Sequence, residues 1–220
     1  ARLLLATLLL QIYSTQAAEF EIRVNEYTDP NSRYIITQLK NALEKIDTKY
    51  KLSISHESFT QARTNEEVKT QGLLNLCLTT SDPEIEQELR PIRIPILKGL
   101  LGYRILIINK NNRHKFAQVK TLDDLKQFTF GQGKTWTDTK ILQANGFKVI
   151  TTNKYPGLFH MVEGERFDAF PRGVNEPFGE LAQRPGMTDL TVEDTILLVY
   201  RMPFYLFLSR DNKRLGDDIE

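Results

Sequence analysis

Predicted strands and helices alternate along this chain in two successive halves, and this alternation restricts the fold more than any other feature. In the first half, apolar and polar residues alternate over Phe20–Val24, a helical pattern covers Ile35–Ile46, and a buried-strand pattern covers Leu73–Thr79. A second alternation begins at a helix that Thr121 caps. Such a pattern predicts α/β sheets of mostly parallel strands flanked by helices.

The two halves are separated by residues 93–108, which differ from both. Two apolar runs lie here, with Pro95, Gly99 and Gly102 between them. Pro and Gly are poor helix residues, so this segment is expected to be extended. A chain of 220 residues is long enough to bury a large core, as one domain or as two lobes.

The N-terminus is typical of a secretory signal. Arg2 precedes the apolar run Leu3–Leu10, and small residues follow at Ala17 and Ala18. We therefore predict that residues 1–18 are a signal peptide and that the mature protein is exported. The apolar run is too short to span a bilayer comfortably. The first residue is not Met, and the chain ends in what reads as the start of a helix, so we expect both ends to be truncated.

Composition argues against several classes of function. Basic and acidic residues number 29 and 28, so no nucleic-acid partner is expected. Cys77 is the single cysteine, it lies in a buried-strand pattern, and no disulfide can form within the chain. The three histidines have no metal-ligand spacing, and no nucleophile-elbow motif occurs. We expect no metal, no cofactor and no enzymatic activity.

The stretch Phe128–Leu142 reads as a short buried strand, a glycine turn and a helix that begins near Thr135. A helix start presents backbone N–H groups without partners inside the helix, which attract an acceptor or an anion. We predict that this turn forms one wall of a small-molecule cleft. Alternatively, Thr135, Thr137 and Asp138 cap those N–H groups themselves. A dinucleotide fingerprint is excluded, because its third glycine falls on Trp136.

Six short motifs carry a resemblance to a known family. They are, in chain order, Thr79-Thr80, Ile92–Ile96, Leu122–Leu125, Gly133 with Thr135, Gly164–Ala169 and Tyr205–Asn212. In this order and spacing they resemble the bacterial periplasmic solute-binding proteins of the polar amino-acid class (extracellular solute-binding family 3). The likeness extends from Phe20 to the end of the chain.

The resemblance implies a two-lobed α/β architecture, the type II periplasmic-binding-protein fold. Each lobe is expected to be a mostly parallel sheet flanked by helices, with the ligand held between lobes that close like a hinge. Two extended crossovers, expected near residues 102–105 and 202–205, would join the lobes. Lobe 1 would comprise residues 19–103 and a truncated return over 203–220, and lobe 2 residues 104–202.

The chain departs from this family at three positions. Family members commonly place an Arg for the ligand carboxylate shortly after the threonine pair, where this chain has Glu84–Gln87. One of two threonines after the glycine is replaced by Lys134. The acidic residue that usually holds the ligand amine falls near Arg172, where no carboxylate exists. The positive charge of Arg172 predicts an anionic or carboxylate-bearing ligand.

Arg172 and Trp136 are the foremost candidates for ligand contact. Arg172 follows a predicted strand, where clefts of open α/β sheets form, and a guanidinium there can clasp a carboxylate in two-pronged fashion. The alternative is a surface ion pair with Glu176. Trp136 lies just inside the predicted helix, where it stacks on a ligand or packs between the lobes.

Further candidates each have a structural alternative. Thr135 and Thr137 contact ligand or cap the helix, and Asn175 likewise. Tyr27 forms an aromatic wall on the other lobe or packs in its core. Thr79 and Thr80 are candidates for ligand contact because they match the family motif. Two arginines that flank the first crossover, Arg93 and Arg104, replace the missing ligand-binding Arg or form structural ion pairs.

These features predict an exported, monomeric receptor for a small polar solute. Closure of the lobes would bury the solute and present a new surface to a membrane permease of an ABC-type transporter. A second hypothesis is the ligand-sensing domain of a membrane signalling system. A third is an enzyme on the same scaffold, since fold does not fix function.

Overall fold

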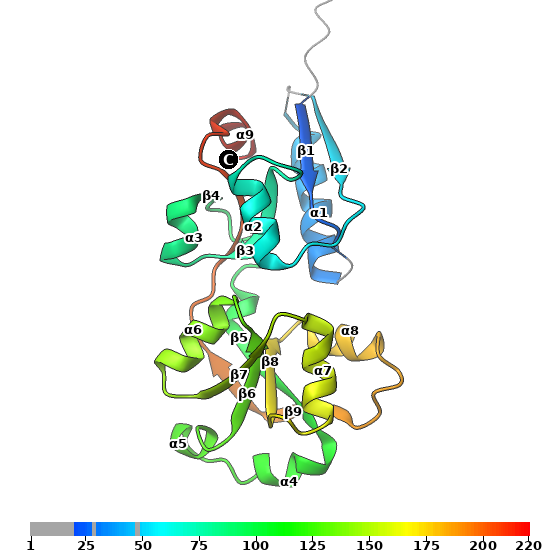
Figure 1. Cartoon of the computed structure of the whole chain (residues 1–220), viewed down its shortest axis with the longest axis vertical. Helices are drawn as coiled ribbons and strands as arrows, with labels where there is room; N and C mark the ends of the chain where they lie inside the picture. Colours follow the sequence, from blue (N-terminus) through cyan, green and yellow to red (C-terminus); the bar gives the residue numbers. More distant parts are fainter. Residues whose placement is uncertain (1–19, 28–29, 47–48) are drawn as a thin grey trace, which may run out of the picture.

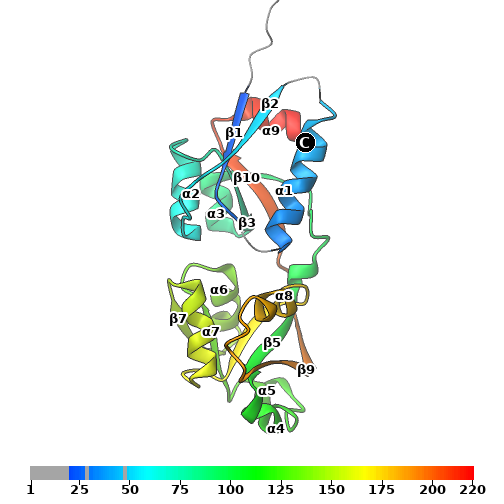
Figure 2. The same cartoon turned by 90° about the vertical axis from the view of Figure 1, so that its right-hand side faces the viewer.

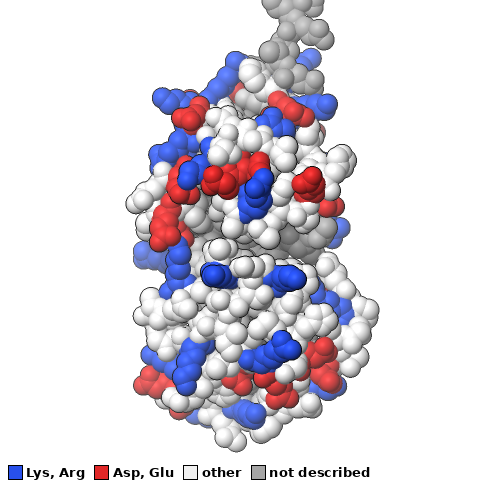
Figure 3. Space-filling view, viewed as in Figure 1, with Lys and Arg blue, Asp and Glu red and all other residues white. Residues whose placement is uncertain are grey.

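The computed structural model describes residues 20–27, 30–46 and 49–220, so the predicted signal peptide lies outside the described residues. The described chain forms two lobes that lie end to end along the long axis of the molecule (Figures 1 and 2). On the face shown in Figure 3, acidic and basic side chains are interspersed on both lobes. No described helix is long and apolar enough to cross a membrane.

Lobe 1 contains two small sheets. The strands β1 (Phe20–Val24) and β2 (Tyr50–Ile54) pair in parallel. The second sheet has the order β3 (Leu76–Thr80), β10 (Phe204–Ser209) and β4 (Leu89–Ile92). The helices of this lobe are α1 (Pro30–Leu43), α2 (Gln61–Lys69), α3 (Pro83–Glu88) and α9 (Lys213–Ile219).

Apolar periodicity explains how lobe 1 packs. Ile22 and Val24 alternate along β1, and Ile35 and Leu39 lie one helical turn apart on α1, so each element buries one face. These residues are packed with the inner residues of β3 and β10 in a single core. The structure therefore confirms the strand predicted at Phe20–Val24 and, as far as Leu43, the helix predicted over Ile35–Ile46.

Lobe 2 is built on one five-stranded sheet with the order β7-β6-β8-β5-β9. The strands are β5 (Tyr103–Asn109), β6 (Thr129–Gly133), β7 (Lys148–Thr152), β8 (Ala169–Gly173) and β9 (Leu190–Val199). The helices are α4 (Arg113–Phe116), α5 (Leu122–Leu125), α6 (Thr137–Ala144), α7 (Tyr155–Glu163) and α8 (Pro177–Ala182). Alternate residues of β5 enter two separate cores, Leu106 and Ile108 in one and Ile107 in the other, so this strand is covered on both faces.

The α/β architecture is confirmed, but the expectation of mostly parallel sheets is wrong in detail. The strand β5 runs antiparallel to both β8 and β9, and β10 runs antiparallel to both β3 and β4. The physical reason is the connection between lobes. The strands β5 and β10 are those on which the chain enters one lobe from the other, so no βαβ crossover within the same sheet fixes their direction.

The two segments that join the lobes run side by side. The backbone N–H of Tyr200 donates to the carbonyl of Gly102 at 3.0 Å, and Tyr103 pairs with Val199. A Cβ atom at position 102 would lie 2.6 Å from the Tyr200 carbonyl oxygen, so this approach requires glycine. The two crossovers are thus present, but the first is extended only in part, because a turn over residues 96–99 and a short 3-10 helix, Leu100–Gly102, precede β5. The precise lobe boundaries stay predictions.

Candidate functional site

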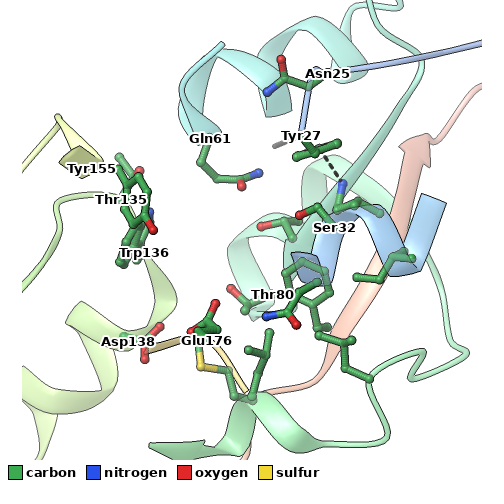
Figure 4. A pocket seen from close by; sticks show the side chains of 18 of the residues that line it. Asn25, Tyr27, Ser32, Gln61, Thr80, Thr135, Trp136, Asp138, Tyr155 and Glu176 are labelled. Atoms are coloured by element: carbon green, nitrogen blue, oxygen red, sulfur yellow. Dashed lines mark hydrogen bonds between the residues drawn. The ribbon is translucent and has the colours of Figure 1, made fainter. Parts of the chain in front are cut away.

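A cleft of about 320 Å³ lies between the lobes and is lined by residues of both (Figure 4). Lobe 1 contributes mainly uncharged polar side chains, among them Asn25, Tyr27, Ser32, Gln61, Thr79 and Thr80. Besides Thr135, lobe 2 contributes aromatic and ionisable side chains, among them Trp136, Asp138, Tyr155, Arg172 and Glu176. A cleft of this size accommodates one small solute.

The ends of several strands place these residues at the cleft. Tyr27 follows β1, Thr80 ends β3, Thr135 and Trp136 follow β6, and Arg172 lies near the end of β8. Loops after the carboxyl ends of strands form the usual ligand crevice of open α/β sheets. The sequence prediction that the turn after Phe128–Phe130 contributes one wall agrees with this placement.

Trp136 lies at the N-cap position of α6 and is half-buried. Its ring stacks on Phe170 with the centroids 6.3 Å apart, and it lies 6.1 Å from the ring of Tyr155. A Cβ atom on Gly133 would lie 2.4 Å from the indole, so glycine at this turn allows the ring to fold back. Trp136 therefore both lines the cleft and packs within lobe 2.

Arg172 is enclosed by other side chains of lobe 2. Its Nη2 atom lies 2.6 Å from Glu180 Oε1 and 2.9 Å from Glu176 Oε1, and its Nε atom lies 3.0 Å from Glu180 Oε2. The side chain is only 11% exposed. The predicted alternative of a pair with Glu176 is correct in its partner, but the pair is buried rather than on the surface.

This arrangement overturns the expectation of an anionic ligand. The expectation depended on a guanidinium available to clasp a carboxylate, whereas the charge of Arg172 is already matched by two carboxylates of its own lobe. Burial alone would lower the pKa of Arg172, but Glu176 and Glu180 raise it well above its usual value, so the group stays charged.

Arg104 forms a second buried ion pair beside the first. Its Nη2 atom lies 3.0 Å from Asp138 Oδ1, and its Nη1 atom lies 3.3 Å from Glu176 Oε2. The hydroxyl of Tyr200 donates to Asp138 Oδ1 at 2.6 Å. Among the described residues, the buried Nε atom of Arg104 has no hydrogen-bond partner.

Five ionisable side chains thus form one charge cluster in the cleft: Arg104, Asp138, Arg172, Glu176 and Glu180. Two are cations and three are carboxylates, so these five groups carry one surplus negative charge when all are ionised; a further cation, Arg184, lies beside them and acts on Glu180. A positive charge on a bound solute would offset that surplus.

The two carboxylates on Arg172 have opposite pKa shifts. Burial raises the pKa of Glu176, and the positive charges of Arg172 and Arg104 offset this only in part. Burial also acts to raise the pKa of Glu180, but the charge of Arg172 and hydrogen bonds from Arg172 and Tyr155 lower it below its usual value. Glu176 is therefore the carboxylate that takes up a proton first as the pH falls.

The wall of lobe 1 is organised by hydrogen bonds. The Tyr27 hydroxyl accepts from the Leu78 N–H at 3.2 Å, and Gln61 Nε2 donates to Asn65 Oδ1 at 2.8 Å. Figure 4 shows Gln61 pointing into the space opposite Trp136. Amide and hydroxyl groups in this position can donate to and accept from a polar solute.

Side-chain contacts of three lobe 2 residues, Thr137, Asn175 and Lys140, bridge the lobes at the rim of the cleft. Thr80 donates to Thr137 at 2.7 Å, and Asn175 Nδ2 donates to Asn31 Oδ1 at 2.8 Å. The Nζ atom of Lys140 lies 3.2 Å from Asp82 and 2.6 Å from Glu84. The lobes are therefore held together on more than one side of the cleft.

The sequence-predicted residues fall into two groups. Seven line the cleft: Tyr27, Thr79, Thr80, Arg104, Thr135, Trp136 and Arg172. Thr137 and Asn175 lie at the interlobe rim instead, and Arg93 forms an exposed ion pair with Glu86. Arg93 thus forms a structural ion pair, which was the predicted alternative to ligand binding.

Sequence reasoning did not select Glu180, Tyr155 or Gln61 for the cleft. Tyr155 and Gln61 are each the first residue of a helix that follows a strand, so their position after a strand end was a usable signal. Glu180 lies within α8, and no local pattern marks it. Within the described residues, no group of His, Cys, Asp and Glu could hold a metal ion.

Comparison with known proteins identifies the fold. No protein-family model matches the sequence, and no curated protein matches it. Among solved structures, an ancestral arginine-binding protein bound to arginine matches with a TM-score of 0.65 at 15% identity, over 91% of this chain and 88% of that one. A histidine kinase sensor domain with similarity to periplasmic binding proteins also matches with a TM-score of 0.65, at 10% identity, over 90% and 86%.

A third solved structure extends the comparison. It is a putative binding component of an ABC transporter from Wolinella succinogenes, complexed with lysine, with a TM-score of 0.65 at 14% identity, over 90% of this chain and 85% of that one. At such identities the likeness is one of fold. The periplasmic-binding-protein fold that the sequence motifs implied is therefore confirmed.

Proposed function

We propose that this chain is a solute-binding receptor that captures a small amino-acid-like solute between its two lobes. The solute carries an ammonium group and no net negative charge. The observation that carries the proposal is the buried charge cluster of the cleft, in which three carboxylates face two guanidinium groups. A buried surplus charge is costly unless it is paired, so a cationic group on the solute is favoured there.

The solved structures that share the fold support this choice of solute. Their ligands are arginine, glutamine and lysine, each of which has an ammonium group. The uncharged groups of lobe 1, such as Gln61 and Thr80, suit the remaining polar atoms of such a solute. Binding would favour the closed arrangement of the lobes, because only that arrangement offers contacts from both walls.

The proposal also includes export of the protein and transfer of the solute to a membrane permease of an ABC-type transporter. A periplasmic location and a monomeric state belong to it as well. The alternative of a sensory domain is favoured by one observation, the match to a histidine kinase sensor domain over 90% of this chain. A full reading frame that continues into a membrane helix and a kinase module would decide for the sensor.

Thermal unfolding of the chain without residues 1–18 tests the proposed solute class. A panel of glutamine, arginine, lysine, glutamate and succinate is added separately, since a bound ligand raises the melting temperature. We expect an increase with at least one neutral or basic amino acid of the panel and none with succinate. An increase with the dicarboxylates alone would contradict the proposed charge preference, and no increase with any would contradict amino-acid capture.

The variant Trp136→Ala ties the effect to the cleft. Removing a ring that lines the cleft is expected to weaken solute binding by at least about tenfold, because aromatic surface supplies much of the contact area in small-molecule sites. Phe178→Ala is the matched control, since its side chain lies on α8 and is 66% exposed. Calorimetric titration of both variants measures the difference.

A further inference from the structure

Arg172 lies in a complete set of groups that bind a guanidinium ion. Its Cζ atom is 5.1 Å from the ring centroid of Phe170, 5.3 Å from that of Trp136 and 5.6 Å from that of Tyr155. Two carboxylates, Glu176 and Glu180, accept its N–H groups. We call these five residues the guanidinium cage.

The cage is assembled from parts of lobe 2 that are distant in sequence. Trp136 precedes α6, Tyr155 begins α7, Phe170 lies in β8, and the carboxylates lie at and within α8. The Tyr155 hydroxyl donates to Glu180 Oε1 at 2.6 Å and so orients that carboxylate toward Arg172. Aromatic faces and paired carboxylate oxygens are the two kinds of group that bind planar cations in proteins.

Position and charge place the cage beside the solute. Arg172, Trp136, Tyr155, Glu176 and Glu180 all line the interlobe cleft. A cationic side chain that entered from the cleft would therefore meet the cage, but Arg172 already fills it. The remaining charged neighbours, Arg104 on Glu176 and Arg184 over Tyr155, add further repulsion for a second cation.

We propose that Arg172 is a specificity-determining residue that fills a guanidinium cage from within and so restricts the cleft to solutes with short, uncharged side groups. This restriction rests on the proposed function, whereas the cage itself does not. Shortening Arg172 to Ala leaves the three rings and two carboxylates in place and opens them to the cleft. The variant should then accept a guanidinium compound from solution.

The test measures thermal unfolding of Arg172→Ala with and without methylguanidinium chloride, against sodium chloride of equal ionic strength. The variant is expected to melt below the wild type, because two buried carboxylates lose their partner. Methylguanidinium at ten times its dissociation constant should raise the melting temperature of the variant by about 3 °C and leave the wild type unchanged. Arg184→Ala is the matched control, because Arg184 stacks on Phe159 at 3.7 Å and donates to the backbone carbonyl of Glu180 at 2.7 Å, but takes part in none of the ion pairs within 4 Å between described residues.

Equal responses of Arg172→Ala and Arg184→Ala, or none in either, would overturn the cage. If Arg172→Ala does not fold alone, methylguanidinium must restore its native circular dichroism, and failure to do so also overturns the proposal. Arg172→Met provides a second check, since a long uncharged side chain keeps the cage filled and should abolish the response.

Calorimetry then tests the effect on specificity. Arginine and agmatine should bind Arg172→Ala at least about tenfold more tightly than the wild type, as expected for a desolvated cation with aromatic and carboxylate partners. Unchanged affinity for both would refute the role in specificity. A wild type that binds no amino acid would contradict the proposed function only, because the methylguanidinium test needs no natural solute.

Discussion

The two walls of the cleft are made of different chemistry. Apart from the exposed Glu26, the wall of lobe 1 presents amides, hydroxyls and apolar groups. The wall of lobe 2 holds the charge cluster, whose cations and carboxylates pair with one another, and the aromatic rings around Arg172. One wall can adapt its hydrogen bonds to a solute, whereas the other is fixed by its own ion pairs.

This difference separates two tasks that a binding site must perform. A buried, mutually paired cluster is held in one geometry, and breaking it is costly. Partly exposed amides such as Gln61 can change partner at little cost to the fold. We therefore expect substitutions in lobe 2 to act on stability and substitutions in lobe 1 to act on solute affinity.

The largest effect is expected for Glu180→Gln. Removing one charge from a buried pair typically costs about 3 kcal/mol or more, because the partner charge stays buried. Since the pKa of Glu180 is lowered in the fold, its stabilising contribution is present above its unfolded pKa and is lost as the pH falls through its folded pKa. Urea unfolding should therefore show a gap between wild type and variant in the free energy of unfolding, and this gap should narrow in acid. Glu57→Gln, an exposed carboxylate of lobe 1, is the control and should show no gap.

Gln61→Ala tests the opposite wall. Its contact with Asn65 is a partly buried i,i+4 pair within one helix, so the free energy of unfolding should change by no more than about 0.5 kcal/mol. Affinity for whichever amino acid stabilises the wild type should fall by about tenfold, the usual value of one lost hydrogen bond in a site. A large loss of stability with unchanged affinity would contradict the division between the walls.

Glu176→Gln is expected to cost less stability than Glu180→Gln at neutral pH, because burial already raises the pKa of Glu176 and Gln keeps an oxygen that can accept from Gly173. The sign of its pH dependence is opposite to that of Glu180. A raised pKa gives a contribution that is present below the unfolded pKa and is lost as the pH rises through the folded pKa. Relative to this variant, the wild type should therefore gain stability as the pH falls. If the stability difference from wild type changed with pH in the same direction for both Gln variants, the opposite pKa shifts of the two carboxylates would be contradicted.

The sequence was sufficient for features that depend on neighbouring residues. The strand, glycine turn and helix of Phe128–Leu142 could be predicted because periodicity and turn residues are local, and Trp136 lies at the cleft as a consequence. The wider order of elements was predictable for the same reason. The direction of the strands could not be predicted, because no local residue pattern in β5 or β10 indicates the lobe from which the chain enters the strand.

Features that depend on distant residues were out of reach. The position of Arg172 near a strand end was predictable, and so was Glu176 as a partner. Glu180 and Tyr155 are brought to Arg172 only by the packing of α7 and α8 against the sheet. The prediction of an anionic ligand was wrong for this reason. It treated the charge of Arg172 as available to a ligand, because the carboxylates that pair with Arg172 in the fold were not known from the sequence.

The smallest effect concerns the contact between the walls. Lys140 of lobe 2 pairs with Asp82 and Glu84 of lobe 1, but its side chain is 48% exposed, so Lys140→Met should lower the free energy of unfolding by only about 0.5 kcal/mol. Salt screens such a pair, and the difference from wild type should disappear at high ionic strength. Lys148→Met on the exposed side of β7 is the control. A loss that persists in high salt would mean that Lys140 joins the lobes by packing of its side chain rather than by its charge.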